Sequence, residues 1–247
     1  MSGDSSVIEV IGRLHSCFPD KFGVPRQPGL SSAAQGEIEI LPPYNRPEAF
    51  RGLEEISHIW VTFLFHENLS KPWQPTIRPP RLGGNKRVGV FASRSSFRPN
   101  GLGLSLLKLT QIDVKNGVRL HVSGVDMIDS TPIVDIKPYL PYADAAPNAS
   151  AGWAGQPPER RLEVKFSSQA RQALNHLSGT STGIPGRYPL LEDLVEEVLS
   201  GDPRPTYRRS KADDRTYATR LYDLEVRWHV IDDTTAWVVS ISPYRGG

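Results

Sequence analysis

The chain has 247 residues, of which 38% are hydrophobic, and a formal net charge of +2. This length accommodates one large domain or two smaller ones. The sequence contains no run of about eighteen apolar residues, so we expect no membrane span. Cys17 is the only cysteine, which excludes an intrachain disulfide and a cysteine-rich zinc site. The first residues lack a basic segment followed by an apolar one, so we expect no secretory signal and a soluble, cytoplasmic protein.

The first 143 residues have the pattern of a mainly β domain. Alternating or β-branched segments predict strands at residues 7–14, 36–41, 56–65, 87–91, 102–113, 118–125 and 133–137. Asn116 and Gly117 are typical of a hairpin turn between two of these strands. Proline- and glycine-rich loops separate the strands, which favours a barrel or sandwich whose loops carry the function. Neither a βαβ repeat nor the glycine-rich dinucleotide-binding fingerprint is present.

A smaller α+β unit is expected after a linker. Residues 144–158 are rich in alanine, proline and glycine, which is typical of a linker between domains at residues 1–143 and 159–247. The patterns of the second unit predict a strand at 161–166, a helix capped by Ser167 that runs to Leu177, a helix from Pro189 to Leu199, a strand at 217–231 with a break near Asp223, and a strand at 235–241.

Positive charge is concentrated in the middle of the first unit. No Asp or Glu occurs from residue 68 to residue 112, where the net charge is +8, while the rest of the chain sums to −6. A charged stretch is often only a solvated face, but this imbalance favours an anionic partner. Residues 81–86 form a basic, glycine-containing loop suited to phosphates. Residues 94–101 combine cations, hydroxyls, an aromatic ring and glycine, which suits a nucleotide.

Three aspartates within ten residues, Asp126, Asp129 and Asp135, form a second group. Their oxygens suit magnesium, but Asp-Ser-Thr-Pro at residues 129–132 is typical of a turn, and the spacing alone favours a turn about two to one. A third group, at residues 65–68, ends an apolar strand with His, Glu and Asn. The residues alone leave three roles open for His66, namely a base, a hydrogen-bond donor or a strand cap.

Six motifs occur together in an order that is specific to one protein family. They are P-R-Q-P-G at 25–29, S-H-I-W at 57–60, F-H-E-N at 65–68, R-P-P-R-L-G-G-N at 78–85, G-V-F-A-S-R-S-S-F-R-P-N at 89–100 and V-D-M-I-D-S-T-P-I-V-D-I-K-P-Y at 125–139. Together they resemble the TsaA/TrmO family of S-adenosylmethionine-dependent tRNA methyltransferases. Residues 202–209 and 222–228 resemble that family's C-terminal domain. The resemblance covers most of the chain and is weakest at residues 141–200.

The resemblance implies a fold and an activity. The fold is a single-sheet β-barrel methyltransferase, not a Rossmann one, which works as a homodimer and carries a small α+β domain as a tRNA-binding accessory. The activity is methylation of N6 of N6-threonylcarbamoyladenosine, just 3′ of the anticodon, in threonine tRNAs that read ACN codons. S-adenosyl-L-methionine is the implied cofactor, and no metal, DNA or membrane partner is expected.

The family motifs also assign residues by position. Cofactor contacts are expected at Arg26, Gln27, Pro28, His66, Glu67, Asn68, Arg94, Leu104, Asp129, Thr131, Pro132, Ile133, Val134 and Asp135. Asp129 and Asp135 are the candidate acceptors of the proton that the attacking nitrogen must lose. The anticodon stem-loop is expected to contact Arg78, Arg81, Lys86, Arg87 and Arg98 in the first unit. Further contacts are expected from the second unit, at Tyr207, Arg208 and Arg209.

Two residues depart from the family pattern, which has Pro after R-P-N and Gly after I-D. This chain has Gly101 and Ser130 at those positions. A serine disfavours a positive φ, which puts the family's turn geometry at Ser130 in question. From the residues alone, two other functions stay open. One is a non-catalytic RNA-binding module, and the other is a metal-dependent phosphodiesterase that uses Asp126, Asp129 and Asp135.

Overall fold

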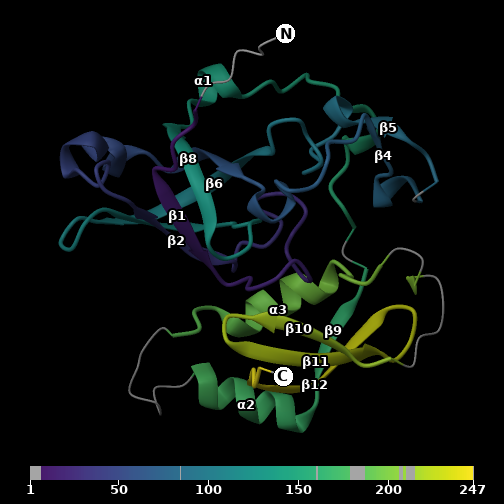
Figure 1. The fold of residues 1–247 in the computed structure, drawn as a ribbon. Helices are drawn as coiled ribbons and strands as arrows, with labels where there is room; N and C mark the ends of the chain where they lie inside the picture. Colours follow the sequence, from purple (N-terminus) through teal and green to yellow (C-terminus); the bar gives the residue numbers. More distant parts are fainter. Residues whose placement is uncertain are drawn as a thin grey trace.

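Six antiparallel strands close into a barrel in the first part of the chain (Figure 1). The computed structural model describes residues 7–83, 85–159, 161–178, 187–205, 208–209 and 215–246. Around the barrel the strand order is β1-β2-β7-β6-β3-β8. The strands are β1 (Gly12–Ser16), β2 (Gln35–Ile40), β3 (His58–Leu64), β6 (Leu102–Asp113), β7 (Arg119–Ser123) and β8 (Thr131–Pro138). Because β8 pairs with both β3 and β1, the sheet closes without a free edge.

Alternation along β3 determines which side chains fill the barrel. Ile59, Val61 and Phe63 are buried, and the residues between them are only partly buried. The neighbouring strand β6 makes room for the Phe63 ring at Gly103, where an added Cβ would lie 2.2 Å from the ring. Every second side chain along the strand is therefore buried in one continuous core, which confirms the predicted mainly β barrel.

Most of the predicted strands are present with shifted ends, and the strand at 102–113 coincides with β6. Gly117 has a φ of 90°, as the predicted hairpin turn between β6 and β7 requires. Short elements occupy the long loops. They are η1 (Pro47–Phe50), η2 (Leu53–Glu55), η3 (His66–Asn68), η4 (Pro80–Leu82), α1 (Pro141–Asp144) and η6 (Gly152–Ala154).

The strand predicted at residues 87–91 is wrong in extent. Only β5 (Val88–Gly89) is extended, in a two-stranded sheet with β4 (Thr76–Ile77). The chain then turns into the 3₁₀ helix η5 (Val90–Ala92), because Ser93 donates both its N–H and its Oγ–H to the carbonyl oxygen of Val90. The hydroxyl competes with strand pairing and ends the strand.

A four-stranded sheet with two helices forms the second unit, as the α+β pattern predicted. Its strand order is β10-β11-β12-β9, and only β9 runs parallel to its neighbour β12. The elements are β9 (Glu163–Phe166), α2 (Ser168–Ser178), α3 (Leu191–Ser200), β10 (Tyr217–Leu221), β11 (Leu224–Val230) and β12 (Thr235–Pro243). In Figure 1, α3 lies between this sheet and the barrel. Within the described ranges, no helix has the length and apolar character needed to cross a membrane.

Local signals account for the ends of these elements. Ala170 N–H donates to Ser167 Oγ at 3.0 Å, which confirms the predicted helix cap. Tyr222 has a φ of 55°, and this left-handed residue separates β10 from β11 next to Asp223, as predicted. The helix predicted from Pro189 begins later, at Leu191, because Leu190 also takes a left-handed conformation, with a φ of 52°.

Candidate active site

A cavity of about 200 Å³ lies where β3 ends. Its walls come from the loop after β1, from β3 and η3, from the acid-free stretch at residues 68–112 (the basic window), and from the segment between β7 and β8 with the first residue of β8. The apolar lining consists of Val24, Phe63, Leu64, Phe65, Met127 and Ile128. A concave, largely apolar site with a few polar groups is typical of small-molecule binding.

The end of β3 is shaped by backbone hydrogen bonds. Phe65 N–H donates to Gly101 O, and Asn68 N–H donates to Phe65 O, each at 2.8 Å, which folds the chain into η3. Gly101 has a φ of 60°, a value that the proline of the family pattern cannot adopt, so this chain forms a different turn there. An added Cβ at Gly101 would lie 2.7 Å from Leu69, so the glycine also allows close packing.

Lys21 connects the loop after β1 to the polar residues of η3. Its Nζ lies 2.9 Å from Glu67 Oε2 and 3.3 Å from Asn68 Oδ1. The hydrogen bond from Lys21 holds the pKa of the Glu67 carboxyl below its usual value, so this group is ionised at neutral pH. Asn68 in turn donates to Ser96 Oγ. Three segments that are distant in the sequence are thereby joined around the cavity.

Asp126 contributes a carboxyl group to the cavity lining. Burial raises its pKa from 3.8 to about 6, although the Ser105 hydroxyl and the positive charge of Arg94 oppose the shift. Ser105 is buried in β6 and donates to Asp126 Oδ1 at 2.6 Å, which fixes the orientation of the carboxyl group. A group with this pKa is ionised at neutral pH and accepts a proton readily, as a general base must.

Sequence comparison assigns both units to one family. The profile of the tRNA-methyltransferase O N-terminal domain matches residues 13–145, and the profile of the TrmO C-terminal domain matches residues 159–244. The chain belongs to the tRNA-methyltransferase O family. The first match contains every residue of the cavity lining, so the site lies within the family's N-terminal domain.

Individual relatives agree with this assignment. The chain is 47% identical to the tRNA (adenine(37)-N6)-methyltransferase of Escherichia coli K12, over 91% of this chain and 93% of that protein. It is also 47% identical to a putative S-adenosylmethionine-dependent methyltransferase of Pseudomonas aeruginosa, over 90% of this chain and 91% of that protein. The crystal structure of TrmO from Pseudomonas aeruginosa superposes with a TM-score of 0.78 at 38% identity and covers 96% of this chain and 98% of that one.

The structure brings part of the predicted cofactor set together. Four of these residues line the cavity, namely His66, Glu67, Asn68 and Thr131. Gln27 and Arg94 come from two separate family motifs, and Arg94 Nη1 donates to Gln27 Oε1 at 2.7 Å. Arg94 also acts electrostatically on Asp126, which places this pair near the cavity. The remaining predicted contacts outside the aspartates, Arg26, Pro28, Leu104, Pro132, Ile133 and Val134, are not part of the lining.

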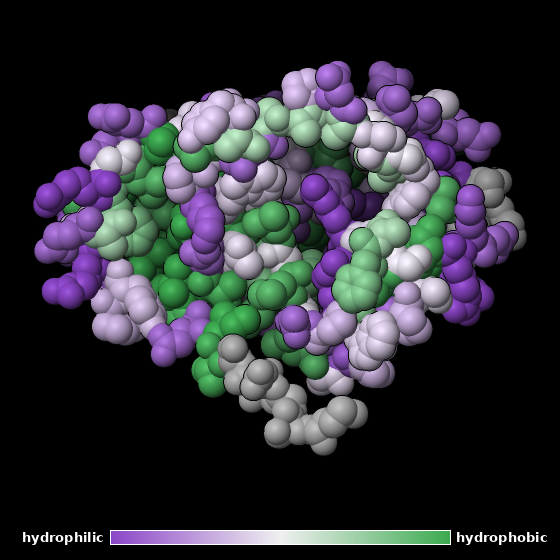
Figure 2. Space-filling model, turned by 90° about the horizontal axis from the view of Figure 1, so that it is seen from above, coloured by the Kyte–Doolittle hydropathy of each residue, from purple (hydrophilic) through white to green (hydrophobic). Residues whose placement is uncertain are grey.

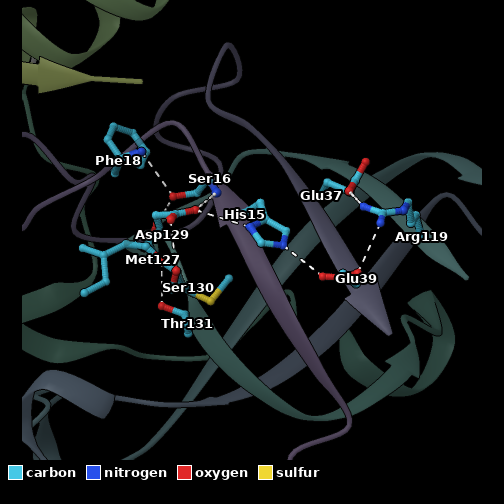
Figure 3. A network of polar contacts seen from close by, with 11 residues as sticks. His15, Ser16, Phe18, Glu37, Glu39, Arg119, Met127, Asp129, Ser130 and Thr131 are labelled. Atoms are coloured by element: carbon cyan, nitrogen blue, oxygen red, sulfur yellow. Dashed lines mark hydrogen bonds and ion pairs between the residues drawn. The ribbon is translucent and has the colours of Figure 1, made fainter. Parts of the chain in front are cut away.

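Asp129 holds a turn (Figure 3). Its carboxylate accepts Ser16 N–H at 2.9 Å and the Ser130 hydroxyl at 3.0 Å, while its own N–H donates to Phe18 O at 2.7 Å. It does not line the cavity, so this geometry favours the turn interpretation over a role as proton acceptor. Ser130 nevertheless has a φ of 62°, so the serine adopts the left-handed turn that its side chain disfavours.

The contacts of Asp129 continue across the barrel wall in Figure 3. His15 Nδ1 lies 3.9 Å from Asp129 Oδ1, and His15 Nε2 lies 3.3 Å from Glu39 Oε2. Arg119 pairs with both Glu37 and Glu39. This chain of side-chain contacts joins β1, β2 and β7, and none of its residues lines the cavity. It therefore supports the barrel and the turn at Asp129.

Asp135 is also engaged elsewhere. It forms an ion pair with Lys137 on the same strand and accepts Ile136 N–H at 2.9 Å, and it does not line the cavity. In the part of the chain that the structure describes, no group of three or more His, Cys, Asp or Glu side chains is placed to hold a metal ion. The ligand set of the phosphodiesterase alternative, Asp126, Asp129 and Asp135, therefore does not converge.

The predicted RNA contacts of the first unit fall into two groups. Four are exposed, namely Arg78, Arg81, Lys86 and Arg87. Of these four, Arg81 donates to Gln156 O and Arg87 donates to Thr76 Oγ1 at 3.0 Å. Arg98 differs because it is partly buried, and it donates to Ser93 O at 2.8 Å and Val90 O at 3.3 Å. Its guanidinium lies 5.7 Å from the centre of the Phe91 ring. These contacts indicate that Arg98 stabilises the turn at η5.

In the second unit, Arg209 has a structural environment. Its Nε donates to Arg204 O at 3.0 Å and its Nη2 donates to Asp202 O at 2.6 Å, and burial lowers its pKa. Arg208 is partly buried. Tyr207, also predicted to bind tRNA, lies outside the described residues.

Sequence reasoning missed several residues of the lining, including Lys21, Phe63, Ser96 and Met127. Phe63 follows the alternation of a barrel core, so nothing in its pattern separates it from Ile59 or Val61. Ser96 and Met127 do lie inside quoted motifs, and that position is the signal that would have found them.

Proposed function

We propose that this protein is an S-adenosylmethionine-dependent tRNA methyltransferase that methylates N6 of adenine 37. We further propose that the target nucleotide is N6-threonylcarbamoyladenosine in the threonine tRNAs that read ACN codons, as the sequence motifs imply. The observation that carries the proposal is the family match over both units. A tRNA substrate is also the basis for proposing a cytoplasmic location.

The cavity residues fit the cofactor in chemical kind. S-adenosylmethionine, when bound, supplies an electrophilic methyl group on a positively charged sulfur. The Phe63 and Phe65 rings offer apolar surface, and Asp126 offers negative charge. A glycine-rich phosphate loop is unnecessary because the cofactor has no pyrophosphate. At about 200 Å³ the cavity is smaller than the ~300–1,000 Å³ of typical ligand sites. We therefore assign it one part of the cofactor, with the rest near Gln27 and Arg94.

Asp126 takes the place of Asp129 and Asp135 as the proposed proton acceptor. The N6 nitrogen of the threonylcarbamoyl nucleotide is urea-like and is a poor nucleophile until its proton leaves. Asp126 faces the cavity, is held by Ser105 and has a pKa of about 6, so it is ionised and available at neutral pH. Holding the attacking nitrogen in line with the methyl group supplies much of the remaining rate enhancement.

The basic window is the proposed site for the anticodon stem-loop. Its exposed cations, Arg78, Arg81, Lys86 and Arg87, suit backbone phosphates. Because the target base must enter a cavity, we propose that it is splayed out of the loop. The second unit is the proposed accessory in this binding, with Arg208 and Tyr207 as candidate contacts.

We also propose that the chain forms a homodimer. Figure 2 shows a broad apolar area on the face that carries α1 and the beginning of the described chain. Apolar side chains at the beginning of the described chain include Val7, which is 92% exposed, and Ile8, which is 51% exposed. Contiguous apolar surface of this kind is typical of an interaction site. Sedimentation of the purified protein tests the proposal, because a monomer at micromolar concentration would contradict it.

Transfer of labelled methyl groups from S-adenosylmethionine to tRNA tests the proposed activity. We expect the label to appear at nucleotide 37 in nuclease digests. Calorimetry with S-adenosylmethionine tests the cofactor separately, since no heat at millimolar ligand would support a non-catalytic RNA-binding module. Loss of activity with a chelator would revive a metal-dependent reaction.

A further inference from the structure

The loop between β1 and β2, residues 17–34, lies against both units of the protein. It supplies Lys21 and Val24 to the cavity and contains the predicted cofactor segment at residues 26–28. At the start of this loop, Tyr222 N–H of the second unit donates to Cys17 O at 2.7 Å. The second unit therefore holds a loop whose other side faces the proposed cofactor site.

Glu197 of α3 anchors the far end of the same loop. Ser31 Oγ and Ser32 Oγ each donate to its carboxylate at 2.8 Å, and Ala33 N–H donates to it at 2.9 Å. Ser31 and Ala33 are each only 2% exposed, so this part of the contact is shielded from water. Hydrogen bonds to a carboxylate are stronger than those between neutral groups, especially where water is excluded.

The middle of the loop also packs on the second unit. Phe22 stacks on Tyr217 with ring centres 6.4 Å apart. Gly23 has a φ of 99°, and an added Cβ there would lie 2.8 Å from Thr219 and 3.3 Å from Val198. The loop therefore follows the surface of α3 and β10 along its length, and Gly23 allows the closest approach.

On its other side, the loop is bonded to the segment that contributes Asp126. Gly29 N–H donates to Gly124 O at 2.9 Å, and Gly124 N–H donates to Ala34 O at 2.9 Å. Asp129 N–H donates to Phe18 O at 2.7 Å. Displacement of the loop would therefore change the positions of both the predicted cofactor segment and the segment at 124–129.

We infer that the second unit positions the cofactor site of the first, and that Glu197 is the positioning residue through which it acts. The inference rests on the proposed function for the identity of the ligand, but the anchoring contact does not. Glu197 acts through Ser31, Ser32 and Ala33, and it does not line the cavity. Its removal should loosen the loop and weaken cofactor binding, with little effect on the chemical step.

The test uses the full chain with Glu197→Ala and Glu197→Gln, and Glu196→Gln as the matched control on the same helix. Hydrogen exchange reports on the loop directly. In Glu197→Ala, we expect amides of residues 17–34 to exchange about tenfold faster while those of β6 are unchanged. Calorimetry should show the Kd for S-adenosylmethionine rising about tenfold, with kcat at saturating cofactor within about twofold of the parent. Glu197→Gln should be intermediate because it keeps one acceptor oxygen, and the control should match the parent.

The other outcomes distinguish failure of the positioning role from failure of the proposed cofactor binding. Unchanged exchange in the loop, or faster exchange with an unchanged Kd, would overturn the positioning role. If the parent protein itself bound no S-adenosylmethionine, the proposed function would fail, while the exchange data would still decide whether Glu197 anchors the loop. If Glu197→Ala did not fold, the double variant Ser31→Ala/Ser32→Ala would remove two of the same hydrogen bonds from the loop side, with the same expected results.

Discussion

Replacing Asp126 with asparagine should make the protein more stable and almost inactive. Burial raises the pKa of this carboxyl from 3.8 to about 6, and about two pKa units at 1.36 kcal/mol each correspond to ~3 kcal/mol for keeping it ionised in the folded state. Asparagine keeps an acceptor for the Ser105 hydroxyl and removes the charge. At pH 7.5 we expect the free energy of unfolding to rise by up to ~3 kcal/mol, measured by chemical denaturation.

The same substitution should lower kcat by ~10²–10⁴-fold, because the variant cannot accept the N6 proton. The kcat should be measured at saturating S-adenosylmethionine, because loss of the negative charge of Asp126 should also raise the Kd for this positively charged cofactor. Full kcat in Asp126→Asn would refute the role as proton acceptor. An unchanged kcat with a raised Kd would instead make Asp126 a cofactor contact.

The pH dependence provides an independent check on Asp126. The ionised form is the active one, so kcat should fall ~tenfold per pH unit below about 6 and level off above it. The folded-state pKa lies above the unfolded one, so the folded protein binds the extra proton between pH 4 and 6, and stability from this group falls as pH rises through that window. Ser105→Ala removes a hydrogen bond that lowers the pKa, so its kcat midpoint should move above 6. A flat profile between pH 5 and 7 would contradict this reasoning.

Three further predictions concern RNA binding and folding. The first variant has alanine at the four exposed cations of the basic window, Arg78, Arg81, Lys86 and Arg87. The slope of log tRNA affinity against log salt should fall by ~0.7–0.9 for each phosphate that is no longer neutralised. An unchanged slope would place the RNA elsewhere. Arg204→Met removes the two-pronged partner of the buried Asp202, at 2.8 and 2.9 Å, and leaves Arg209 Nε 3.8 Å from Asp202 Oδ2. Because Arg209 compensates part of the buried charge, the free energy of unfolding should fall by up to ~3–5 kcal/mol, part of which an added Asp202→Asn should restore. Gly103→Ala places a methyl group 2.2 Å from the Phe63 ring and should cost ~1–3 kcal/mol or more, whereas Gly89→Ala, with nothing within 4 Å, should be neutral in the same denaturation assay.

The barrel was predictable from sequence because its signal is local. In β3 the buried Ile59, Val61 and Phe63 alternate with partly buried residues, so a β-branched and aromatic sequence predicts the strand directly. In β6 the match is weaker, because Gly103 and Ser105 are buried while Leu104 is exposed. The end of β5 was not predictable, since residues 90 and 91 have strand-like side chains. What turns the chain there is the double hydrogen bond from Ser93 to Val90, which depends on the folded arrangement.

The candidate site shows a sharper limit of sequence reasoning. The polar residues that follow β3 were predicted as cofactor contacts from the family motif, whereas the residues alone left the role of His66 open. Asp126 and Asp129 lie three residues apart in the same motif, and spacing alone cannot rank them. Their roles separate only through Ser105 and Ser16, which come from distant strands. Glu197 gave no sequence signal, because the loop residues that its carboxylate binds lie 164 to 166 residues away along the chain.

Methyl transfer to threonine tRNA with and without the threonylcarbamoyl group tests the central claim most directly. Both RNAs should be supplied with labelled S-adenosylmethionine under the same conditions. We predict that the tRNA carrying N6-threonylcarbamoyladenosine at position 37 is labelled and that the tRNA with unmodified adenosine is not. Equal labelling of the two, or labelling of neither, would contradict the proposed substrate.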